Sequence, residues 1–301
     1  MTKKGTKKTI LVTGASGFVG RNLVPYLLDK GYSVIALDKA KIDRDRNSRL
    51  KVITADLSKP GKWQEQIKDA DILVHLAAQI SSKNPGDFDK NNVAATVNLV
   101  DALKNSQVKK IIHFSSAAVT SIRKDKYAST KETQEKLIKK SGKNYVMLRP
   151  SMMYGPTDDK NIGWLIRMIK KYPVIPLPGG GNFGRQPVYI GDVCQIVGKL
   201  ITGRYPKKIY EIHGNEYVTM KQMVKVIIRA EKLKKVVMPI PNSWLFWTFF
   251  IGERVLPNPK FTSDQILSLT SGEKFKGDKW WKVFNVTPTT FEVGVHRMID
   301  R

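Results

Sequence analysis

The 301-residue sequence has a single cysteine, Cys194, and only four histidines, at positions 75, 113, 213 and 296. One thiol excludes an internal disulfide. The histidines are far apart along the chain, and no second cysteine supplies the spacing of a zinc site. We therefore expect no metal-binding site.

Long apolar runs are also missing. No stretch reaches the roughly 18 to 20 apolar residues that a membrane-spanning helix requires. The basic start, residues 1–8, lacks the apolar core of a signal peptide. We therefore expect a cytoplasmic protein. Hydrophobic residues still make up 41% of the chain, which is enough for the core of one large domain or of two joined domains.

Acidic residues are scarce. The chain has 26 Asp and Glu against 52 Lys and Arg, a net charge of +26. Such an excess favours anionic partners, including nucleotides, nucleic acid and lipid headgroups. The lysines are spread along the whole chain and no nucleic-acid-binding motif accompanies them, so a nucleic-acid partner is disfavoured.

One aromatic run, Trp244 to Ile251, lies among the cations Lys234, Lys235, Arg254 and Lys260. It is too short to span a bilayer. A helix packed on the core or at a subunit contact explains it, and a homodimer is therefore left open. The alternative is a peripheral membrane contact in which the rings enter the interface and the cations attract anionic headgroups.

A glycine-rich turn is the most informative feature that is present. An apolar run, residues 9–13, leads directly into glycines 14, 17 and 20 and then into an amphipathic segment, residues 21–30. The first glycine lets the chain turn, the second lets backbone approach a pyrophosphate, and the third lets the helix pack closely on the strand. The pattern predicts a phosphate-binding turn at a helix N-terminus, and the plain alternative is a glycine-rich turn without a ligand.

A second apolar run, residues 33–37, ends in Asp38. A carboxylate at this place can accept hydrogen bonds from the ribose hydroxyls of a dinucleotide and would repel a 2′-phosphate. We therefore expect NAD as the cofactor, with NADP disfavoured. The neighbouring cation Lys39 would make a 2′-phosphate more tolerable.

Strand-like and helix-like runs alternate through the first half of the chain. This alternation predicts an α/β protein with a Rossmann-type doubly wound parallel sheet. The expected strands are residues 9–13, 33–37, 51–54, 71–76, 109–115 and 144–148, and the expected helices are residues 18–30, 88–105, 127–140 and 192–202.

The composition changes after Pro150, where Pro, Gly and aromatic residues become frequent. We expect residues 1–150 to form the NAD-binding domain, with its sheet rejoined by about residues 187–212. Residues 151–186 and 213–301 are expected to form a smaller, mixed C-terminal lobe that binds the substrate.

Three residues suggest acid/base chemistry. Ser116 follows the expected strand 109–115, and Tyr127 and Lys131 lie one turn apart on the next expected helix. A phenol with a reference pKa of about 10 is a poor base at neutral pH, but a nearby ammonium lowers that pKa. Tyr127 could then exchange a proton with a substrate hydroxyl while a hydride moves to or from nicotinamide, with Ser116 holding the same oxygen.

The same Tyr-to-Lys spacing occurs at Tyr26/Lys30 and at Tyr217/Lys221, and both pairs are interpreted as helix surface. Only the 127/131 pair follows a strand that ends near Ser116, where doubly wound sheets place their ligands. The plain alternative for Tyr127 is a packed helix residue.

With these motifs the sequence resembles the extended short-chain dehydrogenase/reductase family, in its NAD-dependent epimerase/dehydratase group. The resemblance covers almost the whole chain. The matching segments are residues 13–20, Asp38, 55–57, 75–78, 92–96, 114–116, 127–131, 148–150, 154–156 and 185–192.

The resemblance implies roles for individual residues. Asp56 would contact the adenine, Asn92 would help to organise the active site, and Arg185 falls where sugar-nucleotide enzymes of the family hold the substrate pyrophosphate, a task suited to a guanidinium. The implied catalytic residues are Ser116, Tyr127 and Lys131. The expected cofactor-binding residues are Gly14, Ser16, Gly17, Phe18, Val19, Gly20, Asp38, Lys39, Asp56, Leu57, Ala77, Ala78, Asn92, Tyr127, Lys131, Pro150 and Ser151. The expected substrate-binding residues are Gln79, Ser116, Met152 and Arg185.

The sequence also departs from the family pattern. Ala117 and Ala118 follow Ser116 where the family's sugar dehydratases carry an acidic pair, which disfavours dehydration. Met152 replaces the substrate-binding asparagine of many sugar-nucleotide enzymes, and the segment between Ser116 and Tyr127 is shorter than usual.

The expected activity is that of an NAD-dependent oxidoreductase or epimerase acting on a hydroxyl or keto group of a nucleotide-activated sugar. Two alternatives stay open. One is a dehydrogenase or reductase for a more apolar hydroxyl or carbonyl compound, as in hydroxysteroid-dehydrogenase-like proteins, and Met152 and the aromatic C-terminal lobe favour it. The other is a cofactor-binding accessory subunit without turnover.

Overall fold

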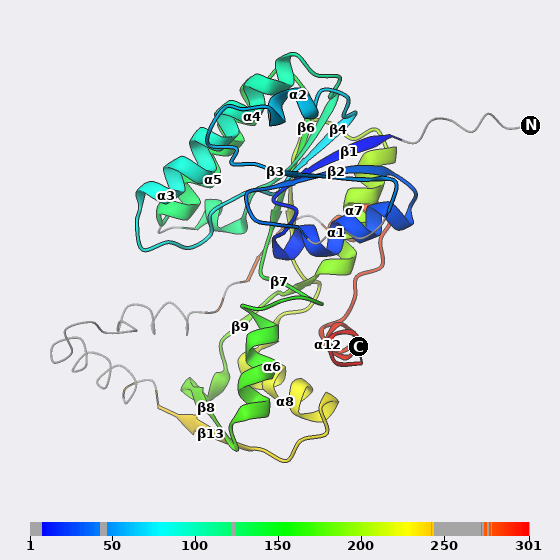
Figure 1. Cartoon of the computed structure of the whole chain (residues 1–301). Helices are drawn as coiled ribbons and strands as arrows, with labels where there is room; N and C mark the ends of the chain where they lie inside the picture. The colour runs from blue at the N-terminus through cyan, green and yellow to red at the C-terminus, as the bar shows by residue number, and fades with distance from the viewer. Residues whose placement is uncertain are drawn as a thin grey trace, which may run out of the picture. The chain divides into compact units, whose positions relative to one another are not determined.

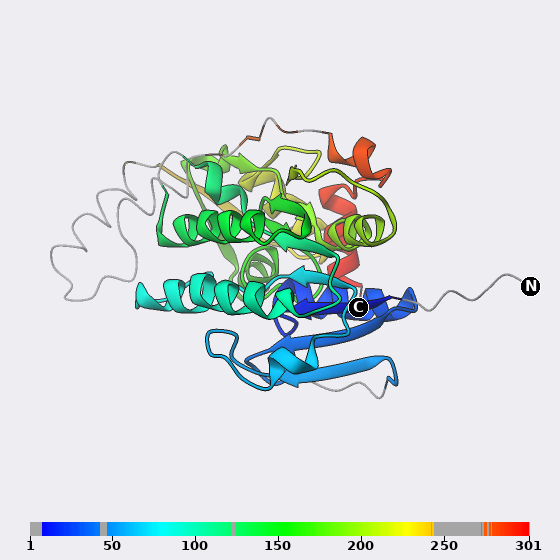
Figure 2. The same ribbon diagram turned by 90° about the horizontal axis from the view of Figure 1, so that it is seen from above.

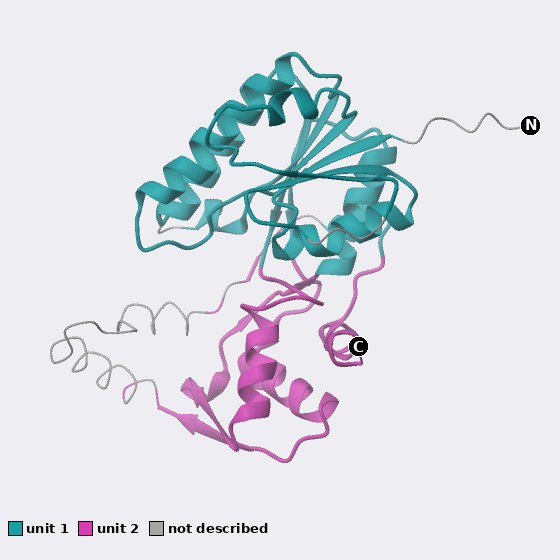
Figure 3. Ribbon diagram, in the orientation of Figure 1, with its two compact units in different colours: residues 1–151, 190–212, 278–286 teal, residues 152–189, 213–277, 287–301 magenta. Residues whose placement is uncertain are grey.

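The computed structural model describes residues 8–42, 47–121, 124–241, 243, 272, 274–275, 277 and 279–300. The chain forms two compact units (Figure 3). Unit 1 comprises Met1–Ser151, Ile190–Ile212 and Asp278–Val286, and unit 2 comprises Met152–Tyr189, His213–Gly277 and Thr287–Arg301. The aromatic run Trp244 to Ile251 lies outside the described residues, so its membrane contact stays a prediction.

Unit 1 is built on a seven-stranded sheet in the order β11-β6-β5-β4-β1-β2-β3 (Figure 1). Every neighbouring pair is parallel. The order reverses between β1 and β4, as in a doubly wound sheet, so the predicted fold class is confirmed. The strands are β1 Thr9–Thr13, β2 Ser33–Asp38, β3 Leu50–Thr54, β4 Ile72–His75, β5 Lys110–Phe114, β6 Asn144–Pro150 and β11 Ile209–Ile212.

Helices cover both faces of this sheet. Figure 1 shows α1 (Phe18–Asp29) and α7 (Ile190–Thr202) on one face, and α2 (Trp63–Gln66), α4 (Ala95–Lys104) and α5 (Lys126–Lys140) on the other. In Figure 2, α4 and α5 run alongside each other. Short helical segments are α3 Gly86–Phe88, η1 Asp89–Ala94, η2 Ala117–Thr120 and α11 Trp280–Phe284.

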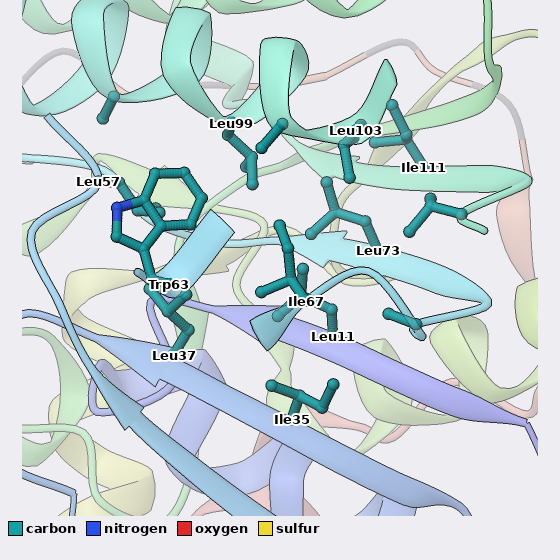
Figure 4. Close-up of a cluster of buried hydrophobic side chains, with 14 of the residues drawn as sticks. Leu11, Ile35, Leu37, Leu57, Trp63, Ile67, Leu73, Leu99, Leu103 and Ile111 are labelled. Atoms are coloured by element: carbon teal, nitrogen blue, oxygen red, sulfur yellow. The ribbon is translucent and has the colours of Figure 1, made fainter. Parts of the chain in front are cut away.

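A core cluster of unit 1 lies between the sheet and the α2–α4–α5 face (Figure 4). All four residues of β4 are buried, because a parallel sheet with helices on both faces has no wet side. Leu11, Leu73 and Leu99 are fully buried there, and the Trp63 indole N–H donates to Lys59 O over 2.9 Å. This rigid layer fixes the strand ends from which the candidate site is built.

In its described residues, unit 2 is a mixed lobe with three two-stranded sheets and three helices. Its buried Tyr154 packs on Tyr189 and Phe291, with ring centroids 5.7 and 5.3 Å away. The paired strands are β7 Met153–Tyr154 with β10 Val188–Tyr189, β9 Gly184–Arg185 with β12 Val218–Thr219, and β8 Val174–Pro178 with β13 Val236–Ile240. The helices are α6 Ile162–Lys171, α8 Met220–Ala230 and α12 Phe291–Ile299, with a short turn η3 at Gly179–Gly181.

Several expectations need correction. The return to the main sheet, expected within about residues 187–212, occurs only at β11, because residues 188–189 form β10, which pairs with β7 in unit 2. Residues 278–286, expected in the substrate lobe, belong to unit 1, where Phe284 packs on Tyr210 with ring centroids 5.0 Å apart. The expected helix 88–105 is three segments, because a π-helical stretch, η1, separates α3 from α4.

The two comparison Tyr/Lys pairs are not both helix surface. Tyr26 is half-buried between α1 and α7, where a Cβ on Gly198 would lie 2.7 Å from its hydroxyl. Tyr217 precedes β12 and lies outside any helix, and its hydroxyl accepts the Gly184 N–H over 2.9 Å. The four-residue spacing of tyrosine and lysine wrongly predicted an exposed helix surface at both pairs. Tertiary packing, not helix periodicity, determines where both tyrosine rings lie.

Candidate functional site

The glycine-rich turn joins β1 to α1. Gly14 has a φ of +71°, and a Cβ there would lie 2.6 Å from the backbone nitrogen of Ala77. A Cβ on Gly20 would lie 2.4 Å from Ala15 O, so only glycine permits this approach of helix and turn. Gly17 caps α1 with no side-chain hydrogen bond, and the first helical turn has no acidic residue. The helix N-terminus is therefore suited to an anion.

Asp38, at the end of β2, is tied to the glycine-rich turn. Its Oδ2 accepts the Ser16 N–H over 3.0 Å, and its Oδ1 accepts the Ala40 N–H over 3.0 Å. The carboxylate can still accept further hydrogen bonds through its remaining lone pairs. Asp38 thus holds the turn in addition to the ribose-binding role expected from the sequence.

The loop after β4 is held by a buried asparagine. Asn92 Oδ1 accepts the Gln79 N–H over 2.6 Å, and its Nδ2 donates to Gln79 O over 3.1 Å and to Thr130 Oγ1 over 2.9 Å. Asn92 therefore links the loop that contains Ala77 and Ala78 to helix α5. This is a physical basis for the organising role that the resemblance implies for it.

Ser116 and Tyr127 come together at the carboxyl end of β5. Ser116 Oγ accepts the Ala118 N–H over 3.2 Å and caps η2, while Asp125 caps α5 by accepting the Ala128 N–H over 2.7 Å. Burial raises the pKa of Tyr127, and the negative charge of Asp125 raises it further, whereas a hydrogen bond with the Ser116 side chain lowers it. The resulting pKa lies above the ordinary value of 10.0.

Lys131 is buried on α5. Its Nζ donates to Phe114 O and to Gln134 Oε1, each over 2.6 Å. Burial lowers the pKa of Lys131 to about 7, although the nearby Glu135 carboxylate acts in the opposite direction. The net pKa of Tyr127 is raised, not lowered as expected, because burial outweighs the effects that lower it.

The remaining expected cofactor residues lie at neighbouring strand ends of unit 1. Asp56 Oδ1 accepts the Ser58 N–H over 2.9 Å, and Lys39 Nζ donates to Asn91 Oδ1 over 3.4 Å. Leu57 is buried, and the Ser151 N–H donates to Ile212 O over 2.8 Å directly after Pro150. All the expected cofactor-binding and catalytic residues thus belong to unit 1.

Two expected substrate residues belong to unit 2, within which they are described. Met152 O accepts the Val188 N–H over 2.9 Å, at the start of the β7–β10 pair. Arg185 is half-buried in β9 and pairs in register with Val218 of β12.

The sequence reasoning missed a buried ion pair beside the site. Arg149 donates through Nε and Nη2 to the two carboxylate oxygens of Glu135, each over 2.8 Å, and Ser115 Oγ donates to Oε1 over 2.6 Å. Glu135 follows Lys131 by one helical turn, so the sequence already indicated that its carboxylate shares a helix face with the candidate catalytic residues.

The sequence reasoning also missed Gln134, which is fully buried beside Lys131. Within the described ranges, no cluster of three His, Cys, Asp or Glu side chains could hold a metal ion. No helix in the described part of the chain has the length and apolar character needed to cross a membrane.

A doubly wound parallel sheet with a glycine-rich turn after β1, and with serine, tyrosine and lysine beside β5, is typical of nucleotide-binding α/β proteins. A model of the NAD dependent epimerase/dehydratase family matches residues 10–212. The chain belongs to this family, as the resemblance indicated.

Two relatives and one solved structure illustrate the similarity. The chain is 27% identical over 267 residues to the mitochondrial NADH dehydrogenase [ubiquinone] 1 alpha subcomplex subunit 9 of Dictyostelium discoideum, covering 85% of this chain and 73% of the relative. It is 27% identical over 273 residues to the UDP-glucose 4-epimerase of Vibrio cholerae, covering 80% and 81%. The UDP-glucuronic acid 4-epimerase of Bacillus cereus, solved in complex with NAD, shares the fold with a TM-score of 0.75 and 21% identity, covering 97% of this chain and 95% of that one.

Proposed function

We propose that this protein is an NAD-dependent oxidoreductase or epimerase that acts on a hydroxyl or keto group of a nucleotide-activated sugar, with Tyr127 as acid/base. The observation that carries the proposal is that the glycine-rich turn and the Ser116–Tyr127 pair follow strands of one sheet on either side of its topological switch point. Doubly wound sheets bind their ligands outside the carboxyl ends of the strands at this point.

The residues present fit a dinucleotide. The approach of Gly14 to Ala77 leaves no room for a Cβ, and α1 begins without a side-chain cap, so backbone N–H groups and the helix dipole would hold a pyrophosphate. Asp38 would accept hydrogen bonds from the ribose hydroxyls. When bound, NAD supplies hydride chemistry, taking a hydride from the substrate carbon and, in an epimerisation, returning it.

Tyr127 and Ser116 would handle the substrate oxygen. The raised pKa keeps the Tyr127 phenol protonated near neutral pH, which suits proton donation to a keto oxygen. Removing a proton from a hydroxyl requires stabilisation of the phenolate, and Lys131 is the buried cation on α5, one helical turn away. Ser116 Oγ would hydrogen-bond the same substrate oxygen and orient it.

Arg185 supports the choice of a nucleotide sugar, because a guanidinium can bind a pyrophosphate with two parallel hydrogen bonds. The similarity to UDP-glucose 4-epimerase points to the same substrate class. Met152 and the apolar side chains of unit 2 favour the alternative, a reductase for a more apolar carbonyl compound. The test must therefore compare the two substrate classes.

A thermal-shift screen of the NAD-loaded protein tests the substrate class. A nucleotide sugar present at about 100 times its Kd should stabilise the native state by about 2.7 kcal/mol and raise Tm. Arg185→Ala should weaken nucleotide-sugar binding by roughly 1.5 to 3 kcal/mol, whereas the exposed control Arg204→Ala should not. A shift with apolar carbonyl compounds alone, unchanged in Arg185→Ala, would favour the alternative substrate.

A second candidate function is a cofactor-binding accessory subunit without turnover. The similarity to a subunit of NADH dehydrogenase favours it, as does a Lys131 ammonium that donates to Phe114 O rather than to a phenolate. This candidate predicts NAD binding with no conversion of any tested substrate, and no effect of Tyr127→Phe beyond stability.

A further inference from the structure

Gln134 lies in a buried polar network that the proposed catalytic set does not include. Its side chain is 0% exposed, one turn after Lys131 on the same face of α5. Oε1 accepts from Lys131 Nζ over 2.6 Å, while Nε2 donates to Asn92 O over 3.1 Å and to Thr96 Oγ1 over 2.7 Å. One carboxamide thus joins the lysine to η1 and α4.

The orientation of this carboxamide is determined by its partners. An ammonium can only donate and a backbone carbonyl can only accept, so Oε1 must face Lys131 and Nε2 must face Asn92 O. A flipped amide would place two donors against each other and two acceptors against each other. Lys131 Nζ therefore donates to an acceptor, Gln134 Oε1, whose orientation is fixed.

The network extends to the glycine-rich turn. Thr96 Oγ1 donates to Asn92 O over 2.6 Å, so it accepts from Gln134 and from His75 Nε2, which is 3.1 Å away. His75 Nδ1 then accepts from Thr13 Oγ1 over 2.7 Å, and Thr13 directly precedes Gly14. Burial, with a contribution from the charge of Lys131, lowers the pKa of His75 to about 3, consistent with a neutral ring.

We infer that Gln134 is a positioning residue for Lys131: with Phe114 O, its fixed carboxamide oxygen holds the buried ε-ammonium in its charged form at the carboxyl end of β5. The inference rests on the proposed function in one respect, because Lys131 is taken as the cation that serves the cofactor and Tyr127. A group that hydrogen-bonds the charged form favours that form, and burial alone disfavours it.

Other charged or titratable groups also face Lys131 and affect its pKa. From the elements packed around it these are Glu135 on α5, His75 on β4 and His113 on β5, with Arg149 of β6 bound to Glu135. Tyr127 lies one helical turn before Lys131 on α5. The test leaves all of these groups in place, because it changes only Gln134.

The test is the pH dependence of stability of the ligand-free protein. Lys131 has a pKa of about 7 in the folded chain against 10.5 in the reference state. Between these values the unfolded chain binds more protons, so stability rises with pH, and the rise begins near the folded pKa. Denaturant unfolding measured from about pH 5 to about pH 9 locates that onset.

Two variants should move the onset in opposite directions. Gln134→Met removes the acceptor and should lower the onset by about one pH unit, whereas Gln134→Glu restores an acceptor with a charge and should raise it by about one unit or more. Both variants lose the hydrogen bonds donated by Nε2, so both should be less stable overall. The control Ile138→Val, one turn further along α5 and fully buried, should be less stable with an unmoved onset.

Parallel stability curves for parent, Gln134→Met and Gln134→Glu would overturn the inference and leave Gln134 a packing residue. If Gln134→Met does not fold, the onset in Gln134→Glu alone decides. Titration of the parent with NAD is a separate readout. Absence of NAD binding would contradict the proposed function without affecting the stability result, and an unmoved onset with intact NAD binding would contradict only the inference.

Discussion

Gly14 and Gly142 form a matched pair for testing the glycine-rich turn. Both have a left-handed backbone, with φ of +71° and +74°. A Cβ on Gly14 would lie 2.6 Å from the Ala77 nitrogen, whereas a Cβ on Gly142 would meet nothing within 4 Å. Alanine at either position costs about 1 to 2 kcal/mol of backbone strain. The difference between the two variants therefore isolates the contact between the turn and the loop after β4.

We expect Gly142→Ala to lower the free energy of unfolding by about 1 kcal/mol, because part of the strain is offset by reduced entropy of the unfolded chain. Gly14→Ala should lower it by about 1 to 3 kcal/mol more, the usual cost of forcing extra volume into a packed place. It should also weaken NAD binding at least about tenfold, which corresponds to 1.4 kcal/mol. Urea unfolding and NAD titration measure both effects.

Equal losses of stability in Gly14→Ala and Gly142→Ala would refute the argument from close approach. Unchanged NAD affinity in Gly14→Ala, despite its loss of stability, would show that the turn does not contact the cofactor.

Three further predictions concern the same unit. Asp38→Asn removes the negative charge that repels a 2′-phosphate, while its side-chain oxygen can still accept the Ser16 N–H. The variant should therefore discriminate less between NAD and NADP in parallel titrations. Tighter binding of NADP than of NAD by the parent would exclude the ribose role of Asp38. Tyr127→Phe should reduce turnover by about 10² to 10⁴-fold without changing NAD affinity, while the control Tyr26→Phe should leave turnover unchanged. Turnover of Tyr127→Phe at the rate of the parent would contradict the acid/base assignment. Arg149→Met leaves the buried Glu135 carboxylate without its bidentate partner and should lower the free energy of unfolding by about 3 to 5 kcal/mol. A loss below about 1 kcal/mol in denaturant unfolding would show that Ser115 and water satisfy the carboxylate.

The sheet of unit 1 could be predicted from the sequence because its signals are local. Apolar runs of strand length, separated by amphipathic segments and punctuated by glycine, predicted β1, β2 and α1 closely. The candidate catalytic residues could be proposed from the sequence, because Ser116 follows a strand and Tyr127 and Lys131 share a helix face, and their roles stay a prediction. The family match to residues 10–212 confirms the family that the motifs indicated.

Long-range pairing could not be predicted in the same way. The strand at 188–189 has the apolar character of a sheet member, but its partner, β7, is set by the fold of unit 2. Residues 280–286 return to unit 1 because Trp280 and Phe284 are buried there, which no local pattern indicates.

The protonation of the site was predicted wrongly for a related reason. Helical spacing places Lys131 near Tyr127, but it does not show where the ammonium donates. Gln134 and Phe114 O decide that direction, and burial then dominates the pKa of Tyr127. The partners of Lys131 are a side chain of α5 and a backbone carbonyl of β5, so helical spacing alone could not reveal them.

The most direct test of the proposed function is a single-turnover experiment. The NAD-loaded protein is mixed with a nucleotide sugar, and the near-ultraviolet absorbance of reduced nicotinamide is followed while the sugar products are separated. We expect a transient absorbance and an altered sugar in the parent, and neither in Tyr127→Phe. An unaltered sugar and a flat absorbance for every nucleotide sugar, in a protein that binds NAD, would contradict the account.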